Sequence, residues 1–236
     1  MADAIFEHPR LAALYDVLEG PRNDLGAYLA LAEETGAREV LDVGCGTGVF
    51  ALLLAGRGFA VTGVEPALAS LEVARGKPGA DRVRWIHGDA TALPPMRTDL
   101  ATMTANVAQA IVAPADWDAT LRGVHAALRP GGLLAFETRD PACRAWESWN
   151  REASHRRIDG VEYWIDLLDV SLPLVTFRWT YVFDDGEVLT SDSTLRFRDR
   201  EEIEEALTEH GYSVEEVRDA PDRPGREFVF LARTTH

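Results

Sequence analysis

Residues 40–49 read VLDVGCGTGV, and this stretch decides the fold class. An apolar run at 40–43 enters a turn that contains Gly44, Gly46 and Gly48, and an apolar helical pattern follows. Glycine lets the backbone turn tightly and approach a ligand without interference from a Cβ atom. In open α/β sheets, ligands bind at the carboxyl ends of the strands. The stretch therefore predicts a strand, a ligand-binding turn and a helix.

Short apolar runs alternate with amphipathic segments after this turn. The pattern predicts strands at 59–64, 83–86, 100–103 and 133–138, with helices at 50–55, 67–74 and 117–128. Such alternation favours right-handed crossovers and a mostly parallel α/β sheet covered on both faces. A helix at 201–210 and strands near 214–217 and 228–232 complete the expected sheet.

Two regions depart from this alternation. Residues 1–35 read as helices, with a break at Gly20-Pro21 and a second helix at 25–34. Residues 161–198 contain β-rich runs, and Asp185-Gly186 between two of them is a hairpin signal. We expect an antiparallel insertion of about three strands there.

Further motifs follow the glycine turn along the chain: TGVEP at 62–66, HGDA at 87–90, DLATMT at 99–104 and LRPGGL at 128–133. Together with the glycine turn, they resemble the motifs of class I S-adenosylmethionine-dependent methyltransferases, in the family's order. The resemblance implies a Rossmann-like, open, mostly parallel seven-stranded sheet with helices on both faces. It also implies S-adenosylmethionine as the cofactor.

The resemblance assigns roles to single residues. Glu65 stands where the family's carboxylate binds both ribose hydroxyls, and an ionised acid can accept from two donors. Asp89 stands where the adenine amine is bound, and Thr104 stands beside the methionine part and the methyl group. The implied cofactor-binding residues are Asp42, Gly44, Cys45, Gly46, Gly48, Glu65, Pro66, Gly88, Asp89, Ala90 and Thr104.

A dinucleotide-binding turn is the alternative reading of this stretch. That turn has the pattern Gly-x-Gly-x-x-Gly, in which the third glycine allows close packing of the helix. Val49 holds the third position here, so a dehydrogenase is disfavoured.

The resemblance also implies the domain organisation. We expect a single methyltransferase domain at 1–236, with an N-terminal helical lid at 1–35 and a cofactor-binding core at 40–138. An inserted acceptor-side subdomain is expected at 140–198, and the C-terminal part of the core at 199–236.

The methyl acceptor is constrained but not named by the sequence. The 24 Lys and Arg against 39 Asp and Glu give a formal net charge of −15, which argues against a nucleic-acid backbone as partner. Residues 104–109, TANVAQ, lack the Asn/Asp-Pro-Pro-Tyr/Phe motif of family members that methylate nucleobase or glutamine nitrogens. The placement of the insertion resembles small-molecule methyltransferases, including sugar N-methyltransferases.

We therefore expect methyl transfer to a nitrogen or oxygen of a small-molecule acceptor, giving S-adenosylhomocysteine. An RNA or protein methyltransferase, or a non-catalytic S-adenosylmethionine-binding protein, are the alternatives.

Acceptor-side candidates come from three places. Tyr15 resembles a tyrosine that such relatives place near the methionine end of the cofactor, although it also fits the core face of a helix. His155 is the candidate base, because histidine titrates near neutral pH. Asn106, Glu137 and Arg139 follow or end expected strands and are candidate acceptor-binding residues.

Two surface patterns in the insertion allow a functional or a structural reading. Phe177, Trp179, Tyr181 and Phe183 alternate on one strand and should share a face. That face either lines an acceptor pocket or packs on the protein's own core or a second subunit. Arginines could recognise an acidic acceptor or face solvent; they are Arg139, Arg144, Arg151, Arg156 and Arg157.

Other classes of site and partner are not expected. Cys45 and Cys143 are the cysteines of the chain, and no paired ligand spacing predicts a metal site. No segment approaches the roughly 20 apolar residues of a membrane span, and residues 1–4 lack a signal-peptide pattern. We expect a cytoplasmic protein with no membrane partner, either a monomer or a homodimer.

Overall fold

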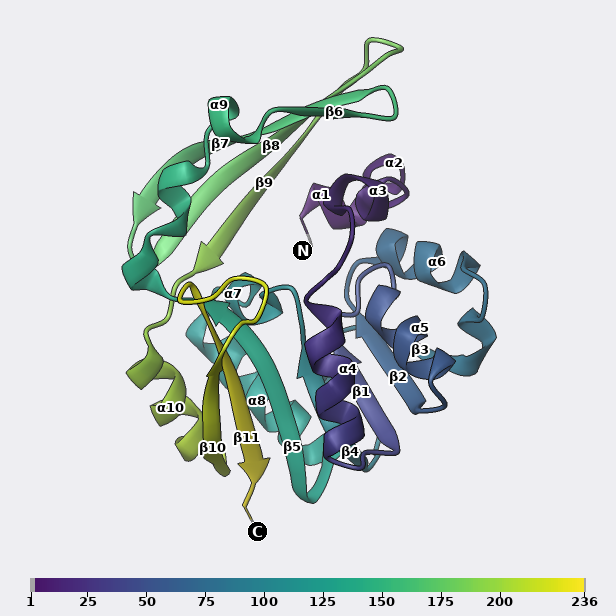
Figure 1. Ribbon diagram of the computed structural model, residues 1–236, viewed down its shortest axis with the longest axis vertical. Coiled ribbons are helices and arrows are strands. Elements are labelled where there is room, and N and C mark those ends of the chain that lie inside the picture. The colour runs from purple at the N-terminus through teal and green to yellow at the C-terminus, as the bar shows by residue number, and fades with distance from the viewer. Residues whose placement is uncertain (1–2, 236) are drawn as a thin grey trace.

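The computed structural model describes residues 3–235 and contains two β-sheets (Figure 1). The larger sheet has seven strands in the order β10-β11-β5-β4-β1-β2-β3. Its strands are β1 (Glu39–Val43), β2 (Ala60–Glu65), β3 (Val83–His87), β4 (Thr98–Met103), β5 (Leu128–Arg139), β10 (Tyr212–Asp219) and β11 (Glu227–Thr234). Strands β1 to β5 pair in parallel, whereas β11 is antiparallel to both β5 and β10. The expected open, mostly parallel sheet is confirmed.

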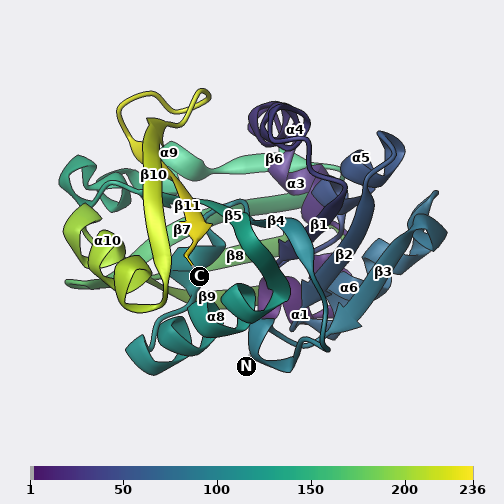
Figure 2. The same ribbon diagram turned by 90° about the horizontal axis from the view of Figure 1, so that it is seen from below.

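Helices cover both faces of this sheet (Figure 2). One face packs against α8 (Pro114–Ala127) and α10 (Arg200–Glu209), and the other against α4 (Leu25–Glu34) and α5 (Val49–Gly56). The side chains of β5 alternate between these two cores, with Phe136 facing α8 and Ala135 facing α4. The remaining core helices are α6 (Leu68–Gly76) and the short α7 (Val107–Ala110), with 3-10 turns η1 (Ala80–Arg82) and η2 (Ala90–Ala92). No helix within residues 3–235 is long and apolar enough to cross a membrane.

The smaller sheet lies between β5 and α10 in the chain. It is antiparallel, in the order β6 (Arg156–Ile158), β7 (Val161–Ser171), β8 (Leu174–Phe183) and β9 (Val188–Arg196). The expectation of about three strands missed β6, which is too short to carry an alternating pattern. The connection from β5 contains η3 (Pro141–Cys143), η4 (Ala145–Ser148) and α9 (Arg151–Ser154).

The N-terminal segment lies between the two sheets (Figure 1). It consists of α1 (Ala4–Glu7), α2 (Pro9–Ala12) and α3 (Tyr15–Glu19) rather than one helix. The break before Pro9 has a local cause, since His8 adopts the extended conformation that a residue before proline prefers. Residues 1 and 2 of the expected lid, and residue 236, lie outside the described residues.

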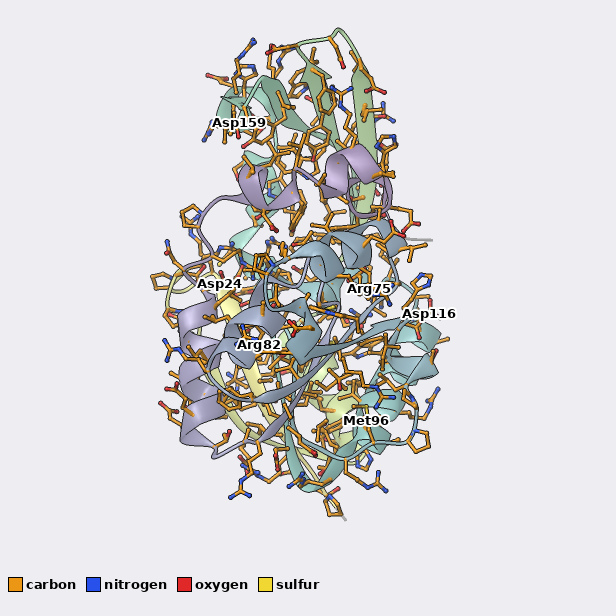
Figure 3. All side chains as sticks on the ribbon, turned by 90° about the vertical axis from the view of Figure 1, so that its right-hand side faces the viewer. Asp24, Arg75, Arg82, Met96, Asp116 and Asp159 are labelled. Atoms are coloured by element: carbon orange, nitrogen blue, oxygen red, sulfur yellow. The ribbon has the colours of Figure 1, made fainter. Side chains whose placement is uncertain are left out.

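The aromatic face of β8 packs against this N-terminal segment. Tyr181 and Phe183 are buried in a cluster with Ile5 and Leu11, and Trp179 packs at its edge. The shared face was expected, and the structure gives it the structural role that the sequence left open. Figure 3 shows the same layering, with Asp159 between β6 and β7 on one side of the N-terminal helices and Asp24, before α4, on the other.

Candidate functional site

The glycine turn connects β1 to α5 with a left-handed backbone. Gly44, Gly46 and Gly48 have φ of 68°, 53° and 80°. In this left-handed region the backbone of other residues is less stable by about 1–2 kcal/mol each. A Cβ atom on Gly48 would lie 2.6 Å from the Trp85 ring, and one on Gly44 would lie 2.7 Å from Val107. A Cβ atom on Gly46 would have no heavy atom within 4 Å among its described neighbours. The turn thus needs glycine for its backbone, and at two positions for packing as well.

Glu65 ends β2 and holds the glycine turn. Its side chain is buried, and its two oxygens accept hydrogen bonds from the Gly46 N–H at 2.9 Å and the Ala67 N–H at 2.8 Å. Burial raises the pKa of Glu65 against these hydrogen bonds. Cys45 completes the junction, because its N–H donates to the Val64 carbonyl at 3.1 Å and its side chain is buried. The carboxylate is thereby fixed beside the turn, where the resemblance puts the ribose.

Asp42 lies under the turn in a fully buried position. The Thr102 hydroxyl donates to Oδ1 at 3.2 Å, while Oδ2 has no partner within residues 3–235. Burial raises the pKa of this carboxyl group to about 7. A buried polar atom without a partner calls for a ligand, a water molecule or a proton. The open backbone of the turn and this orphaned oxygen fit a polar ligand seated on the turn.

Asp89 belongs to the loop after β3. Its Oδ1 accepts from the Thr91 N–H at 2.8 Å, which caps η2 and leaves the carboxylate exposed. The Gly88 N–H donates to the Glu65 carbonyl at 3.0 Å, and His87 contacts the Pro66 carbonyl at 3.1 Å. Ala90 is buried behind the loop. These contacts hold Asp89 next to the end of β2.

The chain turns sharply after β4. Thr104 is buried, and Ala105 and Asn106 follow with φ of 56° and 59°. Non-glycine residues in this region carry strain of order 1–3 kcal/mol each, and such strain concentrates at functional sites. The turn starts α7 and presents Asn106, whose Nδ2 donates to Glu227 at 3.3 Å.

A buried polar network surrounds this turn. Glu137 accepts from the Tyr28 hydroxyl at 3.0 Å, and Arg139 donates to Gln109 at 2.9 Å and pairs with Glu227 at 3.6 Å. The structure thus brings together Asn106, Glu137 and Arg139, the predicted acceptor-side residues. Sequence reasoning missed Tyr28, Gln109 and Glu227. For Glu227 alone there was a usable signal, an acidic residue next to the final apolar strand, where pairing with β5 places it opposite Arg139.

Tyr15 and Asp16 connect α3 to the glycine turn. The Thr47 hydroxyl donates to Asp16 at 2.5 Å, Lys77 forms an ion pair with Asp16, and Lys77 Nζ also donates to the Thr47 carbonyl at 2.7 Å. Tyr15 packs on Phe6, and burial raises its pKa. The N-terminal helices are therefore hydrogen-bonded to the turn that the resemblance assigns to the cofactor.

His155 lies on the other side of the smaller sheet. It is exposed, and its Nε2 is 2.6 Å from Glu162, whose pKa it lowers. Glu162 alternates on β7 with Val161 and Tyr163, which are buried against the N-terminal helices. This places His155 on the face turned away from those helices, so we propose no catalytic role for it.

Most of the arginines considered above face solvent. Arg144, Arg151 and Arg157 form ion pairs with exposed or half-exposed acidic side chains. Arg156 donates hydrogen bonds to the backbone carbonyls of Ala153 and His155. Arg139 joins the buried network. Within residues 3–235, no group of three His, Cys, Asp or Glu side chains is arranged to hold a metal ion.

Comparison with known proteins agrees with this geometry. Residues 40–132 match the model of a family described as a methyltransferase domain. A malonyl-[acyl-carrier protein] O-methyltransferase of Serratia marcescens is 26% identical over 193 residues, which cover 80% of this chain and 70% of that protein.

Solved structures share the fold along nearly the whole chain. The CcbJ methyltransferase of Streptomyces caelestis superposes with a TM-score of 0.80 at 20% identity, covering 98% of this chain and 97% of that one. CalS10, an amino pentose methyltransferase of Micromonospora echinaspora solved with S-adenosylmethionine bound, gives 0.70 at 22% identity, covering 94% and 95%.

Proposed function

The chain carries a class I S-adenosylmethionine-dependent methyltransferase domain, and we propose that it transfers the methyl group to a nitrogen or oxygen of a small-molecule acceptor. The buried polar network of Asn106, Glu137, Arg139 and Glu227 carries this proposal. It lies at the carboxyl ends of β4 and β5, next to the glycine turn, where acceptor and cofactor must meet.

The protein's part in the reaction is to hold two reactants in line and exclude water. The cofactor supplies a methyl group already activated by its sulfonium, so much of the rate enhancement can come from positioning. Glu65 would accept from the ribose hydroxyls, Asp89 from the adenine amine, and the glycine turn would let the cofactor approach the backbone. Tyr15 and the N-terminal helices would cover the methionine end, since α3 is hydrogen-bonded to the turn.

A small-molecule acceptor is favoured by the net charge of the chain, by the placement of the smaller sheet and by similarity to solved structures. The formal net charge of −15 opposes a polyanionic partner. The smaller sheet and the N-terminal helices lie over the carboxyl edge of the core (Figure 1). CalS10, named for an amino sugar, shares this architecture over 94% of the chain.

Titration calorimetry of the purified protein with S-adenosylmethionine, S-adenosylhomocysteine and NAD tests the cofactor site. We expect binding of the two sulfur compounds and none of NAD. Glu65→Ala and Asp89→Ala should each weaken binding by about 1.5–3 kcal/mol, about tenfold or more, because a charged hydrogen bond to the ligand is lost.

Glu162→Ala, which removes an acid from the outer face of the smaller sheet, is the control and should bind normally. Unchanged affinity in both site variants would contradict the assignment. Radiolabelled methyl transfer to a small-molecule pool, bulk RNA and a protein extract then separates the acceptor classes. Incorporation into RNA or protein alone would overturn the small-molecule proposal.

A further inference from the structure

Glu137 is a buried carboxylate without a cationic partner. Its side chain is 3% exposed, and the hydrogen bond from Tyr28 comes from a neutral phenol. Across residues 3–235, no lysine, arginine or histidine nitrogen lies within 4.0 Å of its oxygens. Burial and the nearby charge of Glu227 raise its pKa. A buried ionised group without a counter-charge is costly to a folded protein.

Glu227 provides an internal comparison. It is also 3% exposed, yet Arg223 binds it at 2.7 Å and Arg139 lies 3.6 Å away. The two arginines of the network therefore make their close contacts with Glu227. Of these two buried acids, Glu137 alone has no cationic nitrogen within 4.0 Å among the described residues, and Arg22, Arg139 and Arg223 act on it only from farther away.

The position of Glu137 relates it to the reacting methyl group. It follows Phe136, which pairs with Met103 at the end of β4. Thr104 is the residue after Met103, and the resemblance places it beside the methyl group of the cofactor. Asn106 Oδ1 and Gln109 Nε2 are also buried and have no partner within residues 3–235. Unsatisfied polar atoms are thus concentrated where the acceptor would bind.

We propose that Glu137 binds a basic amino group of the methyl acceptor and that the protein methylates this nitrogen. The inference rests on the proposed function and narrows its acceptor to an amine. An ammonium group supplies both the missing positive charge and N–H donors to the carboxylate. A hydroxyl group supplies one neutral donor and would leave the charge of Glu137 uncompensated.

Methyl transfer to an amine requires only the acceptor, the cofactor and the Glu137 carboxylate. An acceptor R–NH3+ gives one proton to the Glu137 carboxylate and becomes a neutral amine with a free lone pair. This nitrogen forms the new N–C bond while the C–S bond breaks and its electron pair stays on sulfur. The products are S-adenosylhomocysteine and R–NH2+–CH3, and the Glu137 proton then passes to solvent. The raised pKa of Glu137 suits it to hold that proton.

Matched acceptor pairs test the proposal. Each pair keeps one carbon skeleton and exchanges an amino group for a hydroxyl group, as in glucosamine and glucose or cyclohexylamine and cyclohexanol. With methyl-labelled S-adenosylmethionine, we expect label in amine members only. Glu137→Gln should lower kcat/KM for the amine by about a hundredfold and leave the Kd of S-adenosylhomocysteine within about twofold. Glu162→Gln on the outer face is the matched control, and Glu137→Asp should retain part of the activity.

Thermal unfolding of the ligand-free protein at pH 8 tests the same idea without any acceptor. Glu137→Gln should raise the Tm, because it removes an uncompensated buried charge, whereas Glu227→Gln should lower it by leaving arginines unpaired. A fall in Tm for Glu137→Gln as large as that for Glu227→Gln would overturn the proposal. So would label in hydroxyl members with Glu137→Gln fully active, or weaker S-adenosylhomocysteine binding by Glu137→Gln. Failure of the native protein to bind the cofactor would instead overturn the proposed function.

Discussion

Asp42 shows how a single residue of the site can oppose folding. Its carboxyl group is fully buried, has a hydroxyl partner for one oxygen only among the described residues, and has a pKa of about 7. In the unfolded chain the same group titrates near its ordinary value of 3.8. Between these two values the folded protein binds more protons than the unfolded one, so stability falls as pH rises through this window.

Asp42→Asn should remove this dependence. We expect the free energy of unfolding of the native protein to decrease from pH 4 to pH 7 relative to that of Asp42→Asn, and the variant to be the more stable at pH 8. Urea unfolding at several pH values measures the difference. Parallel pH profiles for the two proteins would contradict the buried, proton-retaining state of Asp42.

Some residues of the candidate site can be predicted from the sequence, and others become apparent only in the folded structure. The glycines, Asp42, Glu65 and Asp89 belong to contiguous motifs, so the family resemblance of the sequence is enough to propose them as a group. Tyr28 and Glu227 could not be predicted in this way, because their partners Glu137 and Asn106 are 109 and 121 residues away in the chain. Only the packing of α4 and the pairing of β11 with β5 bring them together.

At the level of elements, the contact between α3 and the glycine turn couples the N-terminal segment to the proposed cofactor site. The Asp16 carboxylate accepts a hydrogen bond from the Thr47 hydroxyl and forms an ion pair with Lys77. One side chain therefore connects α3, the glycine turn and the end of α6. Three further hydrogen bonds hold the segment: Leu68 N–H to Glu7, Ser70 Oγ to the Phe6 carbonyl, and Ile5 N–H to Ser191.

Asp16→Ala should loosen α1 to α3 without unfolding the core. We expect faster proteolysis within residues 3–24 and faster release of S-adenosylhomocysteine, because the segment no longer closes over the turn. Limited proteolysis followed by mass spectrometry, and stopped-flow displacement, measure these two effects. Glu19→Ala, an exposed change on the same helix, is the control. Equal protease resistance of Asp16→Ala and the control would show that Asp16 does not hold the segment.

Elements with strong periodicity were predicted well, and those defined by tertiary contacts were not. The helix at 25–34 agrees with α4, and every strand of the larger sheet was expected near its observed place. The strand expected at 133–138 begins earlier, at Leu128, because Leu128 pairs with Thr98 of β4. The register then shifts and pairing resumes at Leu133, so Pro130-Gly131-Gly132 forms an irregularity within the strand. The short β6 and α7 have too few residues for a pattern to develop.

Considered as a whole, the molecule uses its N-terminal segment to join its two sheets. A cluster of buried apolar side chains joins α1 and α2 to β7 and β8, while the hydrogen bonds above join them to α6. The smaller sheet also contacts the core directly, because β9 packs against α7, and Arg198, just after β9, donates to the Ala108 and Ile111 carbonyls. The relative placement of the two sheets therefore depends on this segment together with the contact between β9 and α7.

Leu11→Ala should weaken that placement. Leu11 is 1% exposed, and truncation of a buried leucine costs about 2–5 kcal/mol of unfolding free energy. Val17→Ala, at a 41% exposed position on α3, should change stability by no more than about 0.5 kcal/mol. Chemical denaturation of both variants gives the comparison. Similar losses at the two positions would mean that the cluster contributes little to holding the sheets together.

The position of this segment between the two sheets also constrains the order of events during synthesis. Ile5 is synthesised 186 residues before its partner Ser191. The cluster around Leu11 likewise waits for Tyr181 and Phe183. The contacts of these helices with the smaller sheet therefore form last, after their partners in the glycine turn and α6 have been made. Until then the segment can dock on the β1–β4 region through one side only, and the apolar side chains that face the smaller sheet stay uncovered.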